Sequence, residues 1–380
     1  MRTIFYWFIQ TIFSLLPVCK NKILFFSYYG KQYGCSPKYL SEYIVKNHPE
    51  WNVVWAFTEP ENYSIAGVVK VRYFSLKYFY EQCTSRVLVT NYRMTDNYRK
   101  RSGQYYIMTW HSSLRLKKIE GDTESTLPAN YVKMAKADSK KIDVLLSGCL
   151  FSDQIFKRAF WYDGTILRSG TPRTDLFYAK DVDSIVSSIK KRLSIKDSLR
   201  IILYAPTFRK EDNLDSYNLD FDALINNISA YTGKEWIVLG RLHPHLSKYS
   251  TTLLQGNHVL DVTGYDDIQE LLLISDILIT DYSSLMFDFV ETRRPCFLYA
   301  PDLEEYQKND RSFYFLLEEL PFPVSQTQNE LHKQIQNLDK VKYAKSINNF
   351  MDKVGSYEDG NASKRVTEYI ERKWIKEAKE

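Results

Sequence analysis

Several short polar segments contain the imidazole, guanidinium and hydroxyl groups that phosphate chemistry needs. In GRLHPH, Arg241 and His243 are two positions apart, so on an extended segment both side chains leave the same face. They suit a pyrophosphate, because either can neutralise the charge that builds on a leaving phosphate. A structural pair is the alternative, although burying both groups without an anion would be costly.

The segment TDYSS (280–284) joins a strand-like stretch to a predicted helix. Ser283 and Ser284 fall where that helix would begin, and the first turn of a helix offers free N–H groups and a positive dipole end to a phosphate. A helix cap would need only one serine or Asp281. Two consecutive serines exceed that need, which indicates a ligand.

Asp288 follows Ser284 by four residues and lies on the same predicted helix face, about one turn deeper. It could accept hydrogen bonds from a ligand's hydroxyls. It could equally pair with Arg293 or Arg294, and the spacing leaves both readings open.

Three further polar segments end strand-like stretches. In TWHSS, His111 could be a general base, because its unperturbed pKa lies near neutrality, or a turn histidine bonded to a backbone carbonyl. In GTPRTD, the fork of Arg173 suits phosphate, and an interdomain ion pair with Asp175 or another acid is the alternative. In YAPTFR, Thr207 offers a hydroxyl and an N–H to a ligand, although Pro-Thr is also ordinary turn chemistry.

All of these segments follow stretches with strand character. Strands alternate with segments of helical spacing, which predicts parallel sheets with crossover helices in two successive halves. Ligands of open α/β sheets bind at the carboxyl ends of strands, so two doubly wound halves joined near residue 180 predict a site in a cleft. The predicted strands are 22–29, 51–57, 85–91, 104–111, 141–148, 165–173, 200–208, 235–244, 257–264, 276–284 and 295–300.

The composition limits the class of protein. With 380 residues, 44% of them hydrophobic, the chain can form two domains. A net charge of +5 fits an anionic substrate or membrane surface, and no basic block with stacking aromatics indicates nucleic acid. The five cysteines form no CxxC pair, and metal-binding histidine spacings, GxGxxG and P-loop motifs are absent. We therefore expect a reducing compartment, no metal site and no standard dinucleotide site.

The N-terminus carries an apolar stretch at 4–18 that few polar residues interrupt. Its length of about 15 residues is short of the roughly 20 that span a bilayer. We interpret it as a membrane-surface helix, and a first helix packed on a core is the alternative. The residues expected near the interface are Arg2, Tyr6, Trp7, Lys20 and Lys22.

Taken together, these segments resemble the CDP-glycerol glycerophosphotransferase family, the teichoic acid primases and polymerases. The stretch FFSYYGKQYGCSPKYL (25–40) also resembles the first strand and loop of that family. The matching pieces, in chain order, are TWH (109–111), GTPRTD (170–175), YAPTFR (204–209), RLHP (241–244), TDYSSLMFDF (280–289), RPCFLYAPDLEEY (294–306) and RSFYF (311–315).

The resemblance implies a GT-B-like fold, with two Rossmann-like domains facing each other across a cleft. It implies transfer of a polyol phosphate, glycerol phosphate first, from CDP-glycerol or CDP-ribitol to a hydroxyl, with release of CMP and without a metal or other cofactor. The domains would be a membrane-associating helix at 1–20, an acceptor-side domain at 21–180 and a CDP-polyol donor domain at 181–380.

The resemblance also implies roles for individual residues. His111 would be the base that deprotonates the acceptor hydroxyl, and His243 would act with Arg241 on the pyrophosphate and the departing CMP. The donor-binding residues would be Trp110, Arg173, Pro206, Thr207, Arg241, Leu242, Ser283, Ser284 and Asp288.

The sequence departs from the family pattern in places. Ser112, Ser113 and Leu114 replace the usual Gly-Thr-Pro after the TWH histidine, and Ser312 replaces the glycine of RGFYF. The usual PGP is PFPV at 321–324. The first change lies beside the proposed base, so it bears on the acceptor, and on the polyol, more than on the class of reaction.

We therefore expect a peripheral protein of the cytoplasmic face of the cell membrane, acting on a lipid-linked glycan or teichoic acid acceptor. One alternative is a GT-B glycosyltransferase that uses a nucleotide sugar in cell-surface polysaccharide synthesis. Another is a non-catalytic, membrane-associated binding protein on a degenerate transferase scaffold. A phosphodiester product, a glycosidic product or no CMP release would separate the three.

Overall fold

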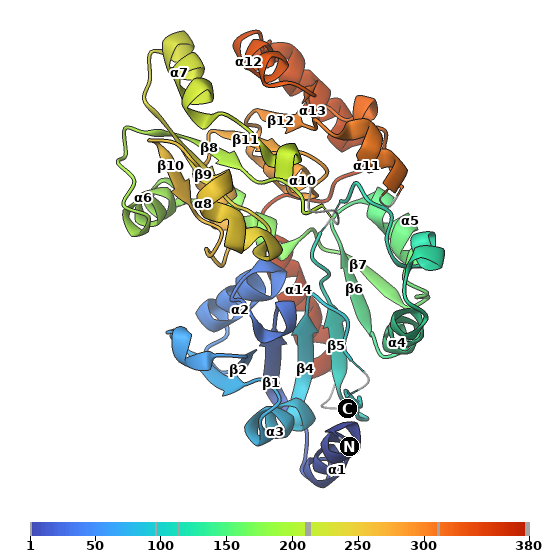
Figure 1. The fold of residues 1–380 in the computed structure, drawn as a ribbon. Coiled ribbons are helices and arrows are strands. Elements are labelled where there is room, and N and C mark those ends of the chain that lie inside the picture. Colours follow the sequence, from blue (N-terminus) through green and yellow to red (C-terminus); the bar gives the residue numbers. More distant parts are fainter. Residues whose placement is uncertain (1, 96, 113, 210–213, 310–311, 377–380) are drawn as a thin grey trace. The chain divides into compact units, whose positions relative to one another are not determined.

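The computed structural model describes residues 2–95, 97–112, 114–209, 214–309 and 312–376, although the side chains of a few of these lie outside the description (Figure 1). Ser113, Arg311 and the side chain of Arg2, which the sequence analysis named, lie outside the description. The chain forms two compact units. The first comprises Met1–Ser113, Ile119–Tyr178 and Ser356–Glu380, and the second comprises Leu114–Lys118 and Ala179–Gly355.

The first unit is built on a parallel sheet with the strand order β3-β2-β1-β4-β5-β6-β7. The central strands are apolar and buried, as expected of a parallel sheet that helices cover on both faces. The strands are β1 (Cys19–Phe26), β2 (Asn52–Phe57), β3 (Val68–Arg72), β4 (Ser85–Thr90), β5 (Tyr105–Met108), β6 (Val144–Ser147) and β7 (Thr165–Arg168).

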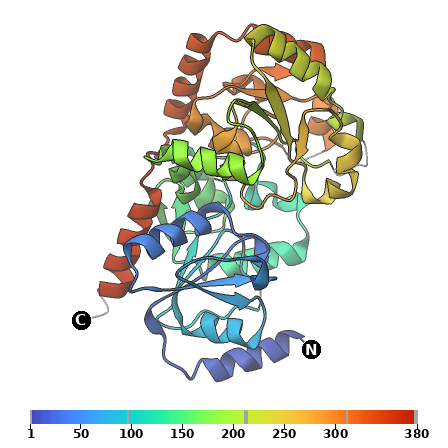
Figure 2. The same ribbon diagram turned by 90° about the vertical axis from the view of Figure 1, so that its left-hand side faces the viewer.

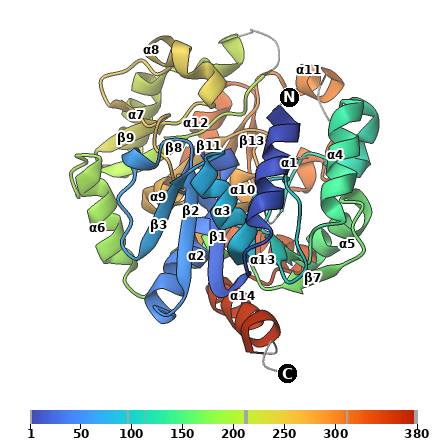
Figure 3. The same cartoon turned by 90° about the horizontal axis from the view of Figure 1, so that it is seen from below.

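The helices of the first unit fall in the connections between these strands and at the two ends of the chain. They are α1 (Arg2–Phe13), α2 (Cys35–Asn47), α3 (Leu76–Thr84), α4 (Ala129–Ser139), α5 (Leu150–Ala159) and α14 (Ala362–Ile370). Seen from below, α1 lies beside α3 (Figure 3).

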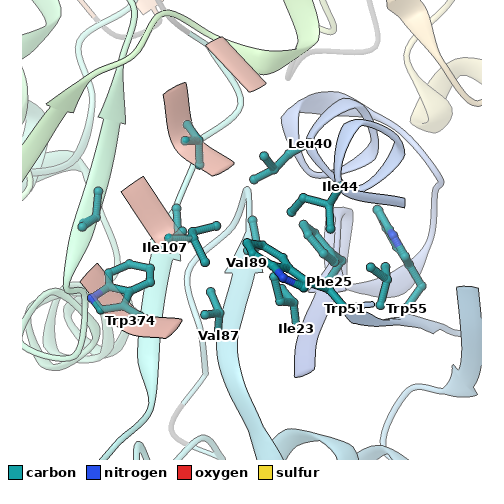
Figure 4. Close-up of a cluster of buried hydrophobic side chains, with 14 of the residues drawn as sticks. Ile23, Phe25, Leu40, Ile44, Trp51, Trp55, Val87, Val89, Ile107 and Trp374 are labelled. Atoms are coloured by element: carbon teal, nitrogen blue, oxygen red, sulfur yellow. The ribbon is translucent and has the colours of Figure 1, made fainter. Parts of the chain in front are cut away.

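The C-terminal helix α14 belongs to the first unit. Val366, Ile370 and Trp374 are spaced four residues apart and join the buried cluster on the first sheet (Figure 4). Trp374 also stacks on Tyr105 of β5, with ring centres 4.5 Å apart. The boundary drawn from the sequence, which placed all of 181–380 in one domain, is therefore wrong for Ser356–Glu380. The sequence shows that this helix has an apolar face, but it does not show which sheet that face covers.

The second unit has a parallel sheet with the strand order β10-β9-β8-β11-β12-β13. This is the Rossmann order, in which the first strand lies at the centre. The strands are β8 (Arg200–Tyr204), β9 (Trp236–Gly240), β10 (Val259–Asp261), β11 (Ile277–Thr280), β12 (Cys296–Tyr299) and β13 (Val324–Ser325).

Apolar residues of α7 and α12 form one buried cluster with strands of this sheet. Figure 2 shows the ribbon from a second side. The helices of the second unit are α6 (Val182–Arg192), α7 (Phe221–Thr232), α8 (Ser250–Leu253), α9 (Ile268–Ile274), α10 (Leu285–Phe289), α11 (Leu303–Asn309), α12 (Gln328–Gln336) and α13 (Lys340–Val354). No helix in the described ranges is long and apolar enough to cross a membrane.

Candidate active site

The polar segments singled out from the sequence lie at the carboxyl ends of their strands, as predicted. TWH follows β5 and GTPR follows β7 in the first unit, whereas APT, RLHP and TDYSS follow β8, β9 and β11 in the second. The first group and its neighbours form the His111 cluster, which comprises Tyr28, Cys35, Asn91, Tyr92, Trp110, His111 and Arg173. The second group, Pro206, Thr207, Arg241, Leu242, His243, Ser283 and Ser284, is the His243 cluster.

The imidazole of His111 is held on two sides. Its Nδ1 lies 3.4 Å from the backbone oxygen of Asn91, and its ring stacks on Tyr92 with centres 4.9 Å apart and planes 17° apart. A carbonyl can only accept, so this contact favours the neutral tautomer with the proton on Nδ1. Nε2 then keeps its lone pair, which is the state that a general base requires.

The backbone around His111 adopts rare conformations. Trp110, Tyr28, Tyr29 and Cys35 all have positive φ angles, between 47° and 59°. Such angles are unfavourable for bulky side chains and gather at functional sites, where the surrounding structure must hold them. In this cluster the rings of Tyr28 and Tyr29 both contact Tyr92, at 5.4 and 4.8 Å between centres.

Arg173 fixes the loop that carries His111. Its side chain is only 4% exposed, its Nη1 donates to the backbone oxygen of His111, and the same nitrogen lies 3.4 Å from Sγ of Cys35. Trp110 is also buried, edge-on to Phe160. The structure therefore gives both residues a positioning role beside His111, and their contact with the donor stays a prediction. Asp175, one ion-pair partner considered for Arg173, accepts the N–H groups of Ala362 and Ser363 at the start of α14.

His243 is exposed and is held in the opposite tautomer. Its Nδ1 accepts the backbone N–H of His245 at 3.3 Å, so in the neutral ring the proton is on Nε2. Desolvation by its neighbours, followed by the charges of His245 and Lys117, lowers the pKa of His243 below its ordinary value. The ring is therefore neutral near pH 7 and presents an N–H donor to a ligand.

The neighbours of His243 in the RLHP segment have separate contacts. Nη1 of Arg241 donates to the backbone oxygen of Tyr265. Leu242 is buried, and its N–H donates to Oγ1 of Thr263 at 3.1 Å. Leu242 thus anchors the segment, while the cationic and imidazole groups on either side of it lie nearer the surface.

Asp281 links the loops after β8, β11 and β12. Both of its oxygens accept the backbone N–H of Thr207, at 2.9 and 3.0 Å, and Oδ2 lies 2.7 Å from Nη1 of Arg209. Arg209 in turn bonds Asp302 through two nitrogens, at 2.7 and 3.0 Å. The hydroxyl of Thr207 has no hydrogen-bond partner in the described part of the chain. Sequence analysis missed this network, although all its members fall inside the quoted motifs.

Ser283 and Ser284 differ in their hydrogen bonds. Oγ of Ser283 accepts the N–H of Leu285 at 3.3 Å, whereas Ser284, the N-cap residue, forms no side-chain capping bond. Ser283 is therefore the capping serine, and the hydroxyl of Ser284 is the one available to a ligand. The helix α10 has only five residues, so its dipole is weaker than the sequence-based prediction assumed.

Asp288 is deeply buried, at 1% exposure, and its Oδ2 accepts from the amide of Gln269 at 2.9 Å. Arg293 donates to Asn348, and Arg294 donates to backbone oxygens. The structure thus gives Asp288 an internal partner, and its contact with donor hydroxyls stays a prediction. Among the described residues, no group of His, Cys, Asp and Glu side chains could hold a metal ion.

Two Rossmann-like parallel α/β units with polar groups at their strand ends define a GT-B-like protein. The solved wall teichoic acid polymerase TagF matches with a TM-score of 0.87 and 32% identity, over 98% of this chain and 94% of that structure. UDP-GlcNAc 2-epimerase from Neisseria meningitidis shares the fold alone, with a TM-score of 0.55 and 12% identity.

The chain belongs to the CDP-glycerol:poly(glycerophosphate) glycerophosphotransferase family, whose model matches residues 8–372. It is 33% identical to a teichoic acid poly(glycerol phosphate) polymerase of Staphylococcus epidermidis, over 92% of this chain and 50% of the relative. It is 34% identical to a teichoic acid glycerol-phosphate transferase of Staphylococcus aureus, over 95% of this chain and 96% of the relative. The chain thus spans about half the length of some curated relatives and nearly all of others.

Proposed function

We propose that this chain transfers glycerol phosphate from CDP-glycerol to a hydroxyl of a teichoic acid acceptor and releases CMP. The observation that carries the proposal is a pair of histidine contacts at strand ends in a chain of this family: Nδ1 of His111 lies by a backbone oxygen, and Nδ1 of His243 accepts a backbone N–H. His111 presents a lone pair on Nε2, which suits a base, and His243 presents an N–H, which suits a phosphate oxygen.

The proposed transfer assigns a role to each cluster. His111 accepts the proton of the acceptor hydroxyl, whose oxygen forms a bond to the phosphorus that carries glycerol. The bond from that phosphorus to the oxygen of CMP breaks, and CMP leaves with the electron pair. His243 Nε2–H, the hydroxyl of Ser284 and the N–H groups of its loop stabilise the charge that grows on CMP.

Names of relatives support glycerol over ribitol. The glycerol-phosphate polymerases and the transferase named above are 32–34% identical to this chain. A ribitol-phosphate primase and a poly(ribitol-phosphate) polymerase of Bacillus spizizenii are 29% and 25% identical. A TagF variant has also been solved after soaking with CDPG. We therefore propose CDP-glycerol as the donor, and a lipid-linked or growing teichoic acid as the acceptor.

We also propose that α1 holds the protein on the cytoplasmic face of the membrane. One side of α1 packs on the first unit, where Tyr6 stacks on Phe74 at 5.2 Å and Gln10 is buried. The other side exposes large apolar groups, including Ile4 at 75% and Phe8 at 63%. A surface helix with an uncovered apolar face fits the boundary of a bilayer better than water.

The test of the proposed activity is incubation with CDP-glycerol and CDP-ribitol across a panel of lipid-linked acceptors, with CMP release and product linkage followed. The proposal expects CMP and a new phosphodiester from CDP-glycerol. A glycoside formed from a nucleotide sugar would identify a glycosyltransferase instead. Absence of CMP release with every acceptor would leave only a binding role.

A further inference from the structure

A cavity of about 550 Å³ lies beside α1 in the first unit. Its lining includes Trp7 of α1, Arg99 of the loop before β5, Asn130 and Lys133 of α4, and Lys141 of the loop before β6. Three of these side chains are cationic, and none of the described residues that line the cavity is acidic. Figure 3 shows α4 to the right of α1. The cavity therefore has the charge that an anionic ligand requires.

Contacts with α1 hold Arg99 in place. The central carbon of its guanidinium lies 4.3 Å from the ring centre of Trp7. Gln10 of α1 is buried, its amide nitrogen donates to the backbone oxygen of Asn97, and its amide oxygen accepts the N–H of Arg99 at 3.1 Å. A cation–π contact uses the face of the ring and none of the N–H donors of the guanidinium. Arg99 is therefore oriented beside α1 with its donors still available to an anion.

A second cation, Lys133, reaches the cavity from α4. Arg99 and Lys133 are both exposed, and neither side chain forms a hydrogen bond or ion pair with the part of the chain that the structure describes. The amide oxygen of Asn130 accepts the N–H of Tyr131 at 2.9 Å, and its amide nitrogen donates to no described residue. Two positive charges and an amide donor around one cavity suit the oxygens of a phosphodiester, because charge-assisted hydrogen bonds are the strong ones.

We propose that this cavity binds the phosphate of an anionic phospholipid. The inference rests on the proposed membrane contact of α1. Trp7 follows Ile4 by three residues and directly precedes Phe8, and these are the exposed apolar groups proposed to enter the boundary of the bilayer. Tryptophan and cationic side chains are typical of the level of the lipid headgroups. A phospholipid with its phosphate between Arg99 and Lys133 therefore has its acyl chains beside the apolar face of α1.

The cavity and the proposed base lie at opposite ends of β5. Arg99 belongs to the loop that enters β5, whereas His111 follows the end of this strand. Lys141 likewise precedes β6, which pairs in parallel with β5. The lipid in the cavity therefore anchors the protein to the surface and is not the acceptor of the transfer.

The cationic lining also determines which lipid binds. A headgroup with a net negative charge, such as that of phosphatidylglycerol, is attracted to Arg99, Lys133 and Lys141 together. Phosphatidylcholine has the same phosphodiester, but its quaternary ammonium is repelled by these cations. We therefore expect the cavity to prefer phosphatidylglycerol over phosphatidylcholine.

The test compares Arg99→Gln and Lys133→Gln with Lys140→Gln in the full chain. Lys140 is the matched control, because it is exposed at the C-terminal end of the same helix and does not line the cavity. Calorimetry measures binding of dihexanoyl-phosphatidylglycerol below its micelle concentration. Loss of one charge-assisted contact should weaken this lipid about ten-fold in each cavity variant, and Lys140→Gln should bind like wild type. Dihexanoyl-phosphatidylcholine should bind wild type more weakly.

Equal binding of dihexanoyl-phosphatidylglycerol by wild type and both cavity variants would overturn the inference. An equal loss in Lys140→Gln would also overturn it, because diffuse surface charge would then explain the binding. Glycerophosphoglycerol and inorganic phosphate separate the sources of the phosphate. Both should bind more weakly than the lipid, because they lack the acyl chains, and equal affinity would assign the cavity to a soluble phosphate instead.

Vesicle sedimentation separates a failure of the cavity from a failure of the proposed membrane contact. Wild type should sediment with phosphatidylcholine vesicles that contain phosphatidylglycerol, and Arg99→Gln should sediment less. If wild type sediments with no vesicle, the proposed contact of α1 with the membrane fails, and the inference fails with it. If Arg99→Gln sediments as wild type does, the cavity alone is excluded.

Discussion

The backbone N–H of His245 donates to Nδ1 of His243 at 3.3 Å, which places the proton of the neutral ring on Nε2. Nε2 is therefore a hydrogen-bond donor in the state that dominates near pH 7, since the pKa of His243 is lowered by desolvation first and then by nearby cations. This contact determines which substitutions at position 243 should preserve activity.

We expect His243→Ala to lower kcat for CMP release by about 10²–10³, the usual cost of removing one donor aimed at developing charge. His243→Gln should lose less, because its amide N–H can occupy the place of Nε2–H. The measurement is the initial rate of CMP formation at saturating CDP-glycerol. A full rate in His243→Ala would exclude the proposed role.

Arg209 should be a stability determinant of the second unit. It is 6% exposed and bonds Asp281 and Asp302, so Arg209→Met leaves buried carboxylates without their cation. Removing one partner of a buried ion pair costs about 3–5 kcal/mol. We expect a loss of that size in the free energy of unfolding, measured by denaturant titration.

The control for Arg209 is Arg200→Met. Arg200 lies 2.7 Å from Asp276, but its side chain is largely open to solvent, and exposed pairs contribute about 0–1 kcal/mol. Similar effects of the two substitutions would contradict the importance of the buried network.

Asp138 should make the first unit less stable as the pH rises. Burial raises its pKa to about 7, against the opposing charge of Arg93, whose Nη1 is 3.6 Å away. Between about pH 4 and pH 7 the folded protein therefore holds a proton that the unfolded chain has released, and stability falls as pH rises through this window. The pH dependence should be flatter in Asp138→Asn. The measurement is the thermal unfolding temperature of wild type and Asp138→Asn across this pH range. Parallel plots of that temperature against pH would refute the prediction.

The exposed face of α1 should determine binding to anionic vesicles. Ile4→Ser with Phe8→Ser removes apolar groups from the uncovered side and leaves the buried Gln10 side intact. We expect the double variant to sediment less with vesicles than wild type. Val341→Ser is the control, because Val341 is 81% exposed in the second unit, far along the chain from α1. Sedimentation of the double variant equal to that of wild type would contradict the proposal that α1 contacts the membrane.

The sequence predicted the two sheets and the position of the reactive groups because its strands are apolar runs that end abruptly in polar residues. It missed β3 and β13, which are edge strands of the two sheets. VVKVR of β3 is only partly buried, and β13 has two residues, so neither shows a buried run. Predicted strands were also too long, because polar residues at their ends belong to loops.

The supporting contacts of the candidate site could not be read from spacing. Arg209 meets Asp281 and Asp302 across 72 and 93 residues of sequence, and such pairings depend on the order of strands in the sheet. The carbonyl of Asn91 that orients His111 is likewise a contact between neighbouring strand ends.

The central claim is that His111 is the base of glycerol-phosphate transfer. The most direct measurement compares wild type with His111→Ala for CMP release and for binding of CDP-glycerol. We predict that His111→Ala loses about 10²–10⁴ in the transfer rate, because general-base catalysis contributes that much. It should still bind CDP-glycerol as wild type does, because His111 is proposed to act on the acceptor hydroxyl. A transfer rate equal to that of wild type would contradict the account.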